Sequence, residues 1–512
     1  MRSGSRLSAV PVLFVVLVFC AAAAFVIHAD GTPPSQAAEI QLQLGTMLYA
    51  EGRYVEALEA YENAIKATDT SLQRSARAGL ITSALRVAEF DLARHEAETL
   101  VKIAPRDASA VSLYADALWA SGLFEEAEGR YRDSLSLQPD LARGLHGVAR
   151  SLLARNQLDD AMVQAQAALR LAPRDLEVHH TVGAIYERMH KYEEAAVAYG
   201  NYVNLLPNKD TSEKAAWSRA EIRFLRSFAQ RVPFQADPGT DDMVYSVDFR
   251  TVNEKVVVTA RVNDSRPQDF VVDTGAENTV ITELTARRLG VAPITYTLSA
   301  GVGETGLRGL QLARVDSLEL GTLKLRNVPV IIKSPPLRDL PTNETESLSP
   351  LSLGYSMIID YGTKKLIFGK HLPVEQGDLE LPLRVYRLAT VRGLVGKDYE
   401  ASFVVDTGGE VISISQATAN RIPLKEGTRK IALKVYGSSG WDKDAFLMPG
   451  MDLAFDKIKY TNFPVVVLNL NAPSALLGFQ LGGIVGHKFL SGYRVGIDLE
   501  RSVLRLKSLS NS

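Results

Sequence analysis

The spacing of apolar residues divides the chain into two halves. Between residues 38 and 232 apolar positions recur at helical intervals, and FEEAEGRYRDSLSLQP places Phe124, Ala127 and Tyr131 on one helix face. Beyond residue 240 the pattern changes to short β-branched runs such as EKVVVTARVN and FPVVVLNL, bounded by Gly, Pro, Asn and Ser. These patterns predict an all-α region followed by a mainly-β region.

A constant period runs through the helical half. It separates Pro105, Pro139, Pro173 and Pro207 equally, and small and aromatic residues repeat at the same interval. Each proline ends the second helix of a unit, and small alanines let paired helices approach closely. A helix–turn–helix period of about 34 residues resembles the tetratricopeptide repeat family. About five units and a closing helix would cover residues 38–232.

The concave face of such a repeat superhelix is, by this resemblance, a binding surface for a peptide or a partner protein. A helical array can also serve as a spacer, or as a support packed on the neighbouring domain. The sequence leaves these alternatives open and does not identify a partner.

The β half contains the same short motif twice. FVVDTGAEN places Asp273, and FVVDTGGEV places Asp406, directly after an apolar run. The later segments IIDYGTKKLIFGK and GIDLERSVLRLKS match each other in the same way. The duplication predicts two similar lobes, at residues 240–370 and 371–512.

Both motifs, together with the terminal segment IVGHKFLSGYRVGIDLERSVLRL, resemble retropepsin-type aspartic proteases. Two copies in one chain resemble the fused, pepsin-like arrangement. The implied fold is therefore a multidomain one, with an all-α tetratricopeptide solenoid followed by a mainly-β, bilobed retropepsin- or pepsin-like domain. The implied activity is that of an endopeptidase acting on a protein or peptide substrate, with no cofactor and no metal.

Two carboxyl groups at hydrogen-bonding distance can hydrolyse a peptide bond, because they share one proton and supply a base and an acid together. We predict that Asp273 and Asp406 form this pair, and the proton belongs to both. The resemblance implies that the threonines lock the two loops together and that the glycines let the backbones approach. These supporting residues are Thr274, Gly275, Thr407 and Gly408.

The residues that follow each motif predict the acidity of the pair. Ala276 and Gly409 carry no hydroxyl that could donate to the neighbouring carboxylate. Losing a donor to the charged form raises a carboxyl pKa, so we expect a mildly acidic optimum.

Two glycine-rich segments, AGVGETG (300–306) and YGSSGW (436–441), are candidate flaps that close over a substrate. The candidate flap residues are Gly301, Gly303, Tyr436, Gly437 and Trp441. Either segment could equally be an ordinary β-turn.

One feature of the family is present in only one copy. The second lobe has the apolar-apolar-Gly sequence Ile484-Val485-Gly486, whereas ESLSPLSLGYSMIIDY in the first lobe has no glycine at the expected place. We therefore expect the first lobe to hold Asp273 less firmly. The protein could therefore be a catalytically weak or inactive peptide-binding module on an exported repeat scaffold. Two further alternatives stay open: an exported assembly scaffold, and an enzyme whose lobes pair between chains.

Residues 1–29 differ from the rest of the chain. Two arginines precede a long uncharged apolar stretch, which predicts a signal peptide or an N-terminal membrane anchor. The remainder would be exported, to the periplasm or outside the cell. The one cysteine, Cys20, lies in this segment, so the exported part has no disulfide and no thiol nucleophile. The net charge of −2 gives no reason to expect nucleic acid as a partner.

Overall fold

The computed structural model describes residues 34–303, 307–333, 346–423 and 429–509. The predicted signal peptide or anchor at residues 1–29 lies outside them. No helix of the described ranges is long and apolar enough to cross a membrane. The chain divides into two compact units, Met1–Val87 and Ala88–Ser512.

From residue 34 onward, where the structure describes it, the first unit contains three helices, α2 (Pro34–Ala50), α3 (Tyr54–Ala64) and α4 (Thr70–Arg86). Small residues allow these helices to pack closely. A Cβ atom added at Gly79 of α4 would lie 2.3 Å from the ring of Tyr61 on α3, so only glycine leaves room for this ring. Asp69 caps α4 by accepting a hydrogen bond from the N–H of Leu72 at 2.8 Å.

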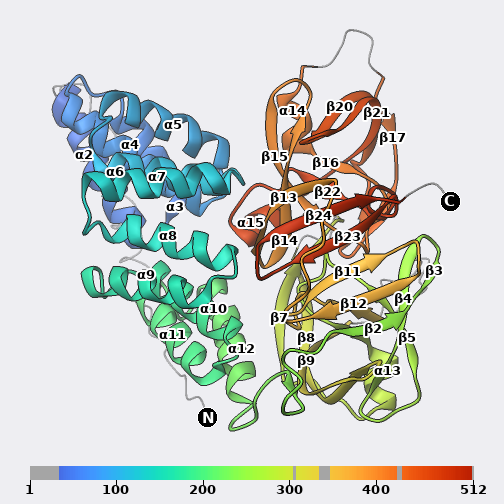
Figure 1. The fold of residues 1–512 in the computed structure, drawn as a ribbon. Helices are drawn as coiled ribbons and strands as arrows, with labels where there is room; N and C mark the ends of the chain where they lie inside the picture. The colour runs from blue at the N-terminus through green and yellow to red at the C-terminus, as the bar shows by residue number, and fades with distance from the viewer. Residues whose placement is uncertain (1–33, 304–306, 334–345, 424–428, 510–512) are drawn as a thin grey trace, which may run out of the picture. The chain divides into compact units, whose positions relative to one another are not determined.

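The second unit begins with eight helices that continue the repeat period (Figure 1). They are α5 (Phe90–Ile103), α6 (Ala108–Ala120), α7 (Phe124–Leu137), α8 (Ala142–Ala154), α9 (Leu158–Leu171), α10 (Leu176–Arg188), α11 (Tyr192–Leu205) and α12 (Glu213–Arg226). The glycine–tyrosine packing of the first unit recurs here, because a Cβ at Gly147 would lie 2.2 Å from the ring of Tyr131. A Cβ at Gly183 would likewise lie 2.6 Å from the ring of Tyr199.

A nine-stranded sheet consists mostly of strands of the first lobe. Eight of its strands follow the order β1-β9-β6-β10-β5-β4-β8-β7, and the ninth, β3, pairs with β4. Their bounds are β1 (Gln235–Ala236), β3 (Arg250–Val252), β4 (Lys255–Val262), β5 (Gln268–Val272), β6 (Val280–Thr282), β7 (Thr295–Ala300), β8 (Leu307–Leu320), β9 (Leu323–Lys333) and β10 (Glu346–Leu348). The short helix α13 (Glu283–Arg288) follows β6.

A thirteen-stranded sheet has the order β17-β20-β21-β16-β22-β15-β14-β13-β24-β23-β11-β12-β2. Its strands are β2 (Tyr245–Asp248), β11 (Ser356–Asp360), β12 (Lys365–Gly369), β13 (Leu379–Tyr386), β14 (Leu388–Val395), β15 (Tyr399–Val405), β16 (Ser413–Ser415), β17 (Ile431–Ala432), β20 (Phe446–Phe455), β21 (Ile458–Leu468), β22 (Gly483–Val485), β23 (Tyr493–Asp498) and β24 (Val503–Ser508). The remaining elements are the hairpin β18 (Val435–Gly437) and β19 (Gly440–Asp442) and the helices α14 (Gln416–Arg421), α15 (Asn471–Leu477) and α16 (His487–Leu490).

The two lobes repeat one arrangement of strands. In the first lobe β5 pairs in parallel with β10, and in the second β15 pairs in parallel with β22. Strand β6 is antiparallel to β10, as β16 is to β22. The duplicated sequence therefore folds twice in the same way.

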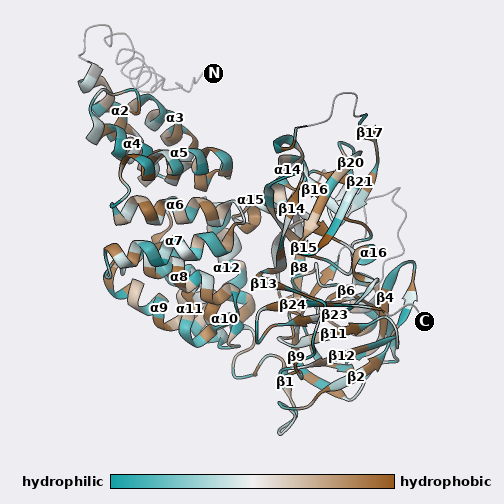
Figure 2. Cartoon of the chain, turned by 45° about the horizontal axis from the view of Figure 1, so that its top comes forward, coloured by the Kyte–Doolittle hydropathy of each residue, from teal (hydrophilic) through white to brown (hydrophobic). Residues whose placement is uncertain are grey.

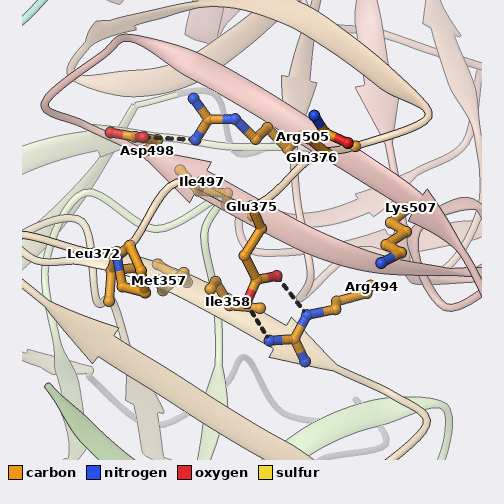
Figure 3. A pocket seen from close by; sticks show the side chains of 13 residues that line it. Met357, Ile358, Leu372, Glu375, Gln376, Arg494, Ile497, Asp498, Arg505 and Lys507 are labelled. Atoms are coloured by element: carbon orange, nitrogen blue, oxygen red, sulfur yellow. Dashed lines mark hydrogen bonds and ion pairs between the residues drawn. The ribbon is translucent and has the colours of Figure 1, made fainter.

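The lobes share the sheet formed by their closing hairpins, where β11 pairs antiparallel with β23. Alternate residues of these strands are buried in one apolar core, and Figure 2 shows hydrophobic residues along them. On β23 of this sheet Arg494 donates two hydrogen bonds of 2.8 Å to Glu375 (Figure 3). Arg494 also pairs with Asp360. A cavity of about 30 Å³ beside them has room for little more than a water molecule. Because Arg494 lies on β23 and Asp360 on β11, their ion pair connects the two lobes.

Helices of the second unit and the β region share a core. Trp119 and Phe124 contact each other with ring centroids 4.7 Å apart. Phe124 also contacts Phe479, and Trp119 contacts Tyr386, at 5.0 and 5.4 Å. Such edge-on aromatic contacts bury large apolar surfaces in a defined geometry. Helices α6 and α7 are thus packed on the second lobe.

Candidate active site

Each repeated Asp-Thr-Gly motif forms a loop at the end of a buried strand. The N–H of Asp273, after β5, donates to the carbonyl of Leu348 on β10 at 2.9 Å. The N–H of Asp406, after β15, donates to the carbonyl of Val485 on β22 at 3.0 Å. The parallel neighbour strand therefore fixes where each loop begins.

The two threonines hold the loops against each other. The hydroxyl of Thr274 donates to the carbonyl of Val405 at 2.6 Å, and that of Thr407 donates to the carbonyl of Val272 at 2.6 Å. Each hydroxyl also accepts from the other threonine's N–H, at 3.2 and 3.0 Å. Both threonines are fully buried. One chain thus supplies both halves of a reciprocal lock.

The glycines of the motifs permit close approach of the two loops. A Cβ atom at Gly275 would lie 2.4 Å from Cγ of Asp406. A Cβ atom at Gly408 would lie 2.7 Å from Cγ of Asp273. Real Cβ atoms do not come so near, so any other residue would push a carboxyl group out of place.

The carboxyl groups of Asp273 and Asp406 interact directly, and each affects the pKa of the other. Oδ1 of Asp273 accepts from the N–H of Gly275 at 3.0 Å. Oδ1 of Asp406 accepts from the N–H groups of Gly408 and Gly409, at 2.8 and 2.9 Å. These donors hold both side chains in a fixed orientation.

Burial raises the pKa of Asp273. Burial, and next the charge of Asp273, raise the pKa of Asp406 to about 7. Two carboxylates so close cannot both ionise easily, and the pair therefore retains a proton over a wide pH range. This arrangement can present a base and an acid to one bound molecule at the same time.

The first aspartate has a hydroxyl donor that the sequence analysis missed. The hydroxyl of Ser347 on β10 donates to Oδ2 of Asp273 at 3.2 Å. We expected no hydroxyl at this carboxylate because Ala276 follows the motif, and that reasoning was wrong for Asp273. The donor comes from a neighbouring strand.

The strand pairing also explains the missing glycine of the first lobe. Ser347 lies opposite Val271 in the β5–β10 pair, as Ile484 lies opposite Val404 in the β15–β22 pair. The sequence Ser-Leu-Ser (347–349) therefore stands where Ile-Val-Gly (484–486) stands in the second lobe. The hydroxyl of Ser349 donates to the carbonyl of Ala276 at 2.6 Å. The first loop thus has its supporting strand, fixed by hydroxyl groups in place of a glycine.

The two candidate flaps meet each other. The N–H of Ser439 donates to the carbonyl of Val302 at 2.9 Å, and the N–H of Gly301 donates to the hydroxyl of Ser439 at 3.0 Å. Gly303 has a φ of +135° and its added Cβ would lie 2.4 Å from the carbonyl carbon of Ser439. A Cβ at Gly437 would lie 2.4 Å from the carbonyl oxygen of Val302. Glycine is therefore required on both sides of this contact.

The second candidate flap is the hairpin β18–β19, in which Tyr436 pairs with Trp441. Their rings contact edge to face with centroids 5.3 Å apart. Residues 304–306, the end of the first candidate flap, lie outside the described residues.

A cavity of about 1330 Å³ contains both carboxyl groups. Asp273, Asp406, Val302, Tyr436 and Trp441 all line it, so the candidate flaps and the aspartates face one space. In the part of the chain that the structure describes, His, Cys, Asp and Glu form no cluster that could hold a metal ion.

Comparison with protein families agrees with this geometry. An aspartyl protease model matches residues 258–357 and 389–486, and each segment contains one of the two loops. A tetratricopeptide repeat model matches residues 21–71 and 79–142. The chain joins tetratricopeptide repeats to two aspartyl protease segments. The predicted fold class, a repeat solenoid followed by a mainly-β protease-like region, is confirmed.

Solved structures of repeat proteins resemble part of this chain. A thermophilic repeat protein of Thermus thermophilus is 22% identical, with a TM-score of 0.32, over 36% of this chain and 99% of that one. PilF of Pseudomonas aeruginosa is 18% identical, with a TM-score of 0.27, over 38% and 94%. MamA of Desulfovibrio magneticus is 16% identical, with a TM-score of 0.25, over 34% and 98%. No curated protein sequence matches the chain.

Proposed function

We propose that the protein is an aspartic endopeptidase that hydrolyses peptide bonds with Asp273 and Asp406. The observation that carries the proposal is the directly interacting pair of half-buried carboxyl groups at the meeting point of two locked loops. The aspartyl protease matches support the same reaction class.

The reaction follows from one shared proton. The ionised carboxylate takes a proton from a water molecule, whose oxygen attacks the carbonyl carbon of the peptide bond. The protonated carboxyl group gives its proton to the carbonyl oxygen, which forms a gem-diol. When the C–N bond then breaks, the protonated carboxyl group gives its proton to the leaving nitrogen, and the carboxylate takes a proton from one hydroxyl of the diol, which becomes a carboxylic acid. The pair returns to its singly protonated state, so protons balance over the cycle.

The flaps would close the site over the substrate. Residues Gly301–Gly303 and the β18–β19 hairpin already touch across the cavity, and substrate entry would require that contact to open. Closure excludes bulk water and strengthens the electrostatic interactions of the carboxyl groups.

The repeats would bring a protein substrate or a partner protein to the protease region, since tetratricopeptide repeats generally mediate protein–protein contact. Residues 1–29 would direct the chain out of the cytoplasm, as a cleaved signal or a retained anchor. The protease would then act in the periplasm or outside the cell.

The test is cleavage of a diverse peptide mixture at several pH values by chains that begin near residue 34. Mass spectrometry would count new peptide termini for the wild type, Asp273→Asn and Asp406→Asn. We expect cleavage by the wild type and none by either variant. A wild type that binds peptides but cuts none at any pH would replace the proposal with that of a peptide-binding module.

A further inference from the structure

The cavity that contains the two aspartates is not formed by the protease lobes alone. Helices α10 and α12 of the repeat region contribute part of its lining. The residues from these helices include His180, Ala184, Glu187, Trp217, Ser218 and Glu221. All of them belong to the same compact unit as both lobes.

This helical wall is bonded directly to the backbone of the second lobe. The guanidinium group of Arg188 at the end of α10 donates to the carbonyl of Val385 on β13 at 2.8 Å. Next to the wall, the hydroxyl of Ser502 donates to the carbonyl of Arg155, which follows α8, at 2.5 Å. The contact of Arg188 with a main-chain carbonyl thus fixes the end of α10 against the second lobe.

Trp217 on α12 is bonded to the strand that leads into the first flap. Its indole N–H donates to the hydroxyl of Thr297 on β7 at 2.7 Å. Arg223, further along α12, donates to the hydroxyl of Thr295 at 3.3 Å. Strand β7 ends at Ala300, directly before the flap glycines, so α12 sets the position from which this flap extends.

Trp217 is also connected to the first aspartate loop. The guanidinium group of Arg387 lies over its indole ring, 5.2 Å from the centroid. The same guanidinium pairs with Glu277 at 2.9 Å, and Glu277 follows Asp273 closely in the sequence. One side chain of the repeat region therefore contacts groups attached to both the flap and the catalytic loop.

We propose that helices α10 and α12 form a third wall of the substrate site, and that Trp217 and Ser218 help to determine which peptides the protease accepts. This inference rests on the proposed function and extends it, since the repeats would contact the substrate beside the scissile bond. The occupant is an extended peptide segment of several residues. A volume of about 1330 Å³ exceeds the roughly 300–1000 Å³ typical of small-ligand pockets. Walls on three sides and closed flaps exclude a folded domain.

A pair of substitutions on one helix tests this wall. Ser218→Trp would place a large ring in the cavity, whereas Ala216→Trp would add the same ring at an exposed position of α12 that does not line it. We expect Ser218→Trp to raise KM for long peptides about tenfold or more and to change the cleavage sites. Ala216→Trp keeps the wild-type profile. Identical cleavage by Ser218→Trp and the wild type would overturn the proposal.

A measurement of peptide binding distinguishes a failure of this inference from a failure of the proposed function. The probe is a peptide with a non-hydrolysable hydroxyethylene group in place of the scissile bond, and its Kd is measured for all three proteins. If the wild type binds the probe but cuts nothing, the endopeptidase proposal fails while the wall is still tested. Weaker binding by Ser218→Trp alone supports the wall, and equal binding by all three proteins overturns it.

Discussion

The hydroxyl of Ser347 donates a hydrogen bond to Oδ2 of Asp273, at 3.2 Å. The equivalent position in the second lobe is Ile484, whose side chain has no donor. The two carboxyl groups are therefore chemically different although their loops are similar. A donor to the charged form favours ionisation. We expect the negative charge to rest mainly on Asp273 and the shared proton on Asp406, whose pKa is raised to about 7 by burial and by the charge of Asp273.

Ser347→Ala tests this asymmetry. Removing the donor should raise the pKa of Asp273, because hydrogen bonds to charged groups stabilise the charged form by about 1.5–3 kcal/mol, or roughly one pKa unit or more. The acid limb of the pH profile of kcat/KM should move to higher pH by about one unit. Ser347→Thr retains the hydroxyl and should keep the limb in place. An unchanged limb in Ser347→Ala would show that this contact does not tune the pair.

Thr274→Val tests the lock between the loops. The substitution keeps the shape of the side chain but leaves the carbonyl of Val405 and the N–H of Thr407 without their buried partner. We expect the free energy of unfolding to fall by about 3 kcal/mol, and cleavage to be lost. Chemical denaturation measures the first effect. Thr251→Val, at an exposed position of β3, is the control and should change stability by less than about 0.5 kcal/mol. Equal effects of both substitutions would argue against the lock.

Gly408→Ala tests the close approach of the loops. The added methyl group would lie 2.7 Å from Cγ of Asp273, so one loop must move and the carboxyl groups must separate. We expect a loss of stability of about 1–3 kcal/mol and a loss of activity of at least a hundredfold. Gly129→Ala on α7 meets no atom within 4 Å and should instead stabilise the helix by about 1 kcal/mol. Full activity in Gly408→Ala would contradict the observed packing.

The raised pKa of Asp406 also predicts how stability depends on pH. Its ordinary value is 3.8, and the folded protein raises this pKa to about 7. Between these values the folded state binds more protons than the unfolded state, so this group lowers stability as pH rises from about 4 to about 7. Asp406→Asn removes the ionisation, and its stability relative to the wild type should increase by on the order of 2–4 kcal/mol over that interval. Parallel stability curves for the two proteins would exclude a raised pKa at this position.

Part of the fold could be predicted from the sequence because individual residues mark its elements. Proline at a constant interval marks each repeat, and one repeated tripeptide places both aspartates. The reciprocal bonds of Thr274 and Thr407 agree with the roles that the family resemblance implied. The repeat period and the repeated motif were therefore sufficient to predict the helical repeats and the two aspartate loops.

Other parts of the site depend on tertiary contacts. Strand β10 is very short and has no apolar alternation, so its pairing with β5 could not be predicted from pattern. A weak signal existed, because the spacing from Ser349 to Asp360 is nearly the same as the spacing from Gly486 to Asp498. The contact of Trp217 with Thr297 joins distant parts of the sequence and has no sequence signature. The helical wall of the cavity follows from packing alone.

The pH dependence of kcat/KM for one peptide substrate, measured for the wild type, Asp273→Asn and Asp406→Asn, tests the shared proton of the two aspartates most directly. Two carboxyl groups that share one proton predict a bell-shaped profile with its acid limb above about pH 3, and no detectable turnover by either variant. Turnover that persists in either variant would contradict catalysis by a pair of aspartates, because a single carboxylate would then suffice.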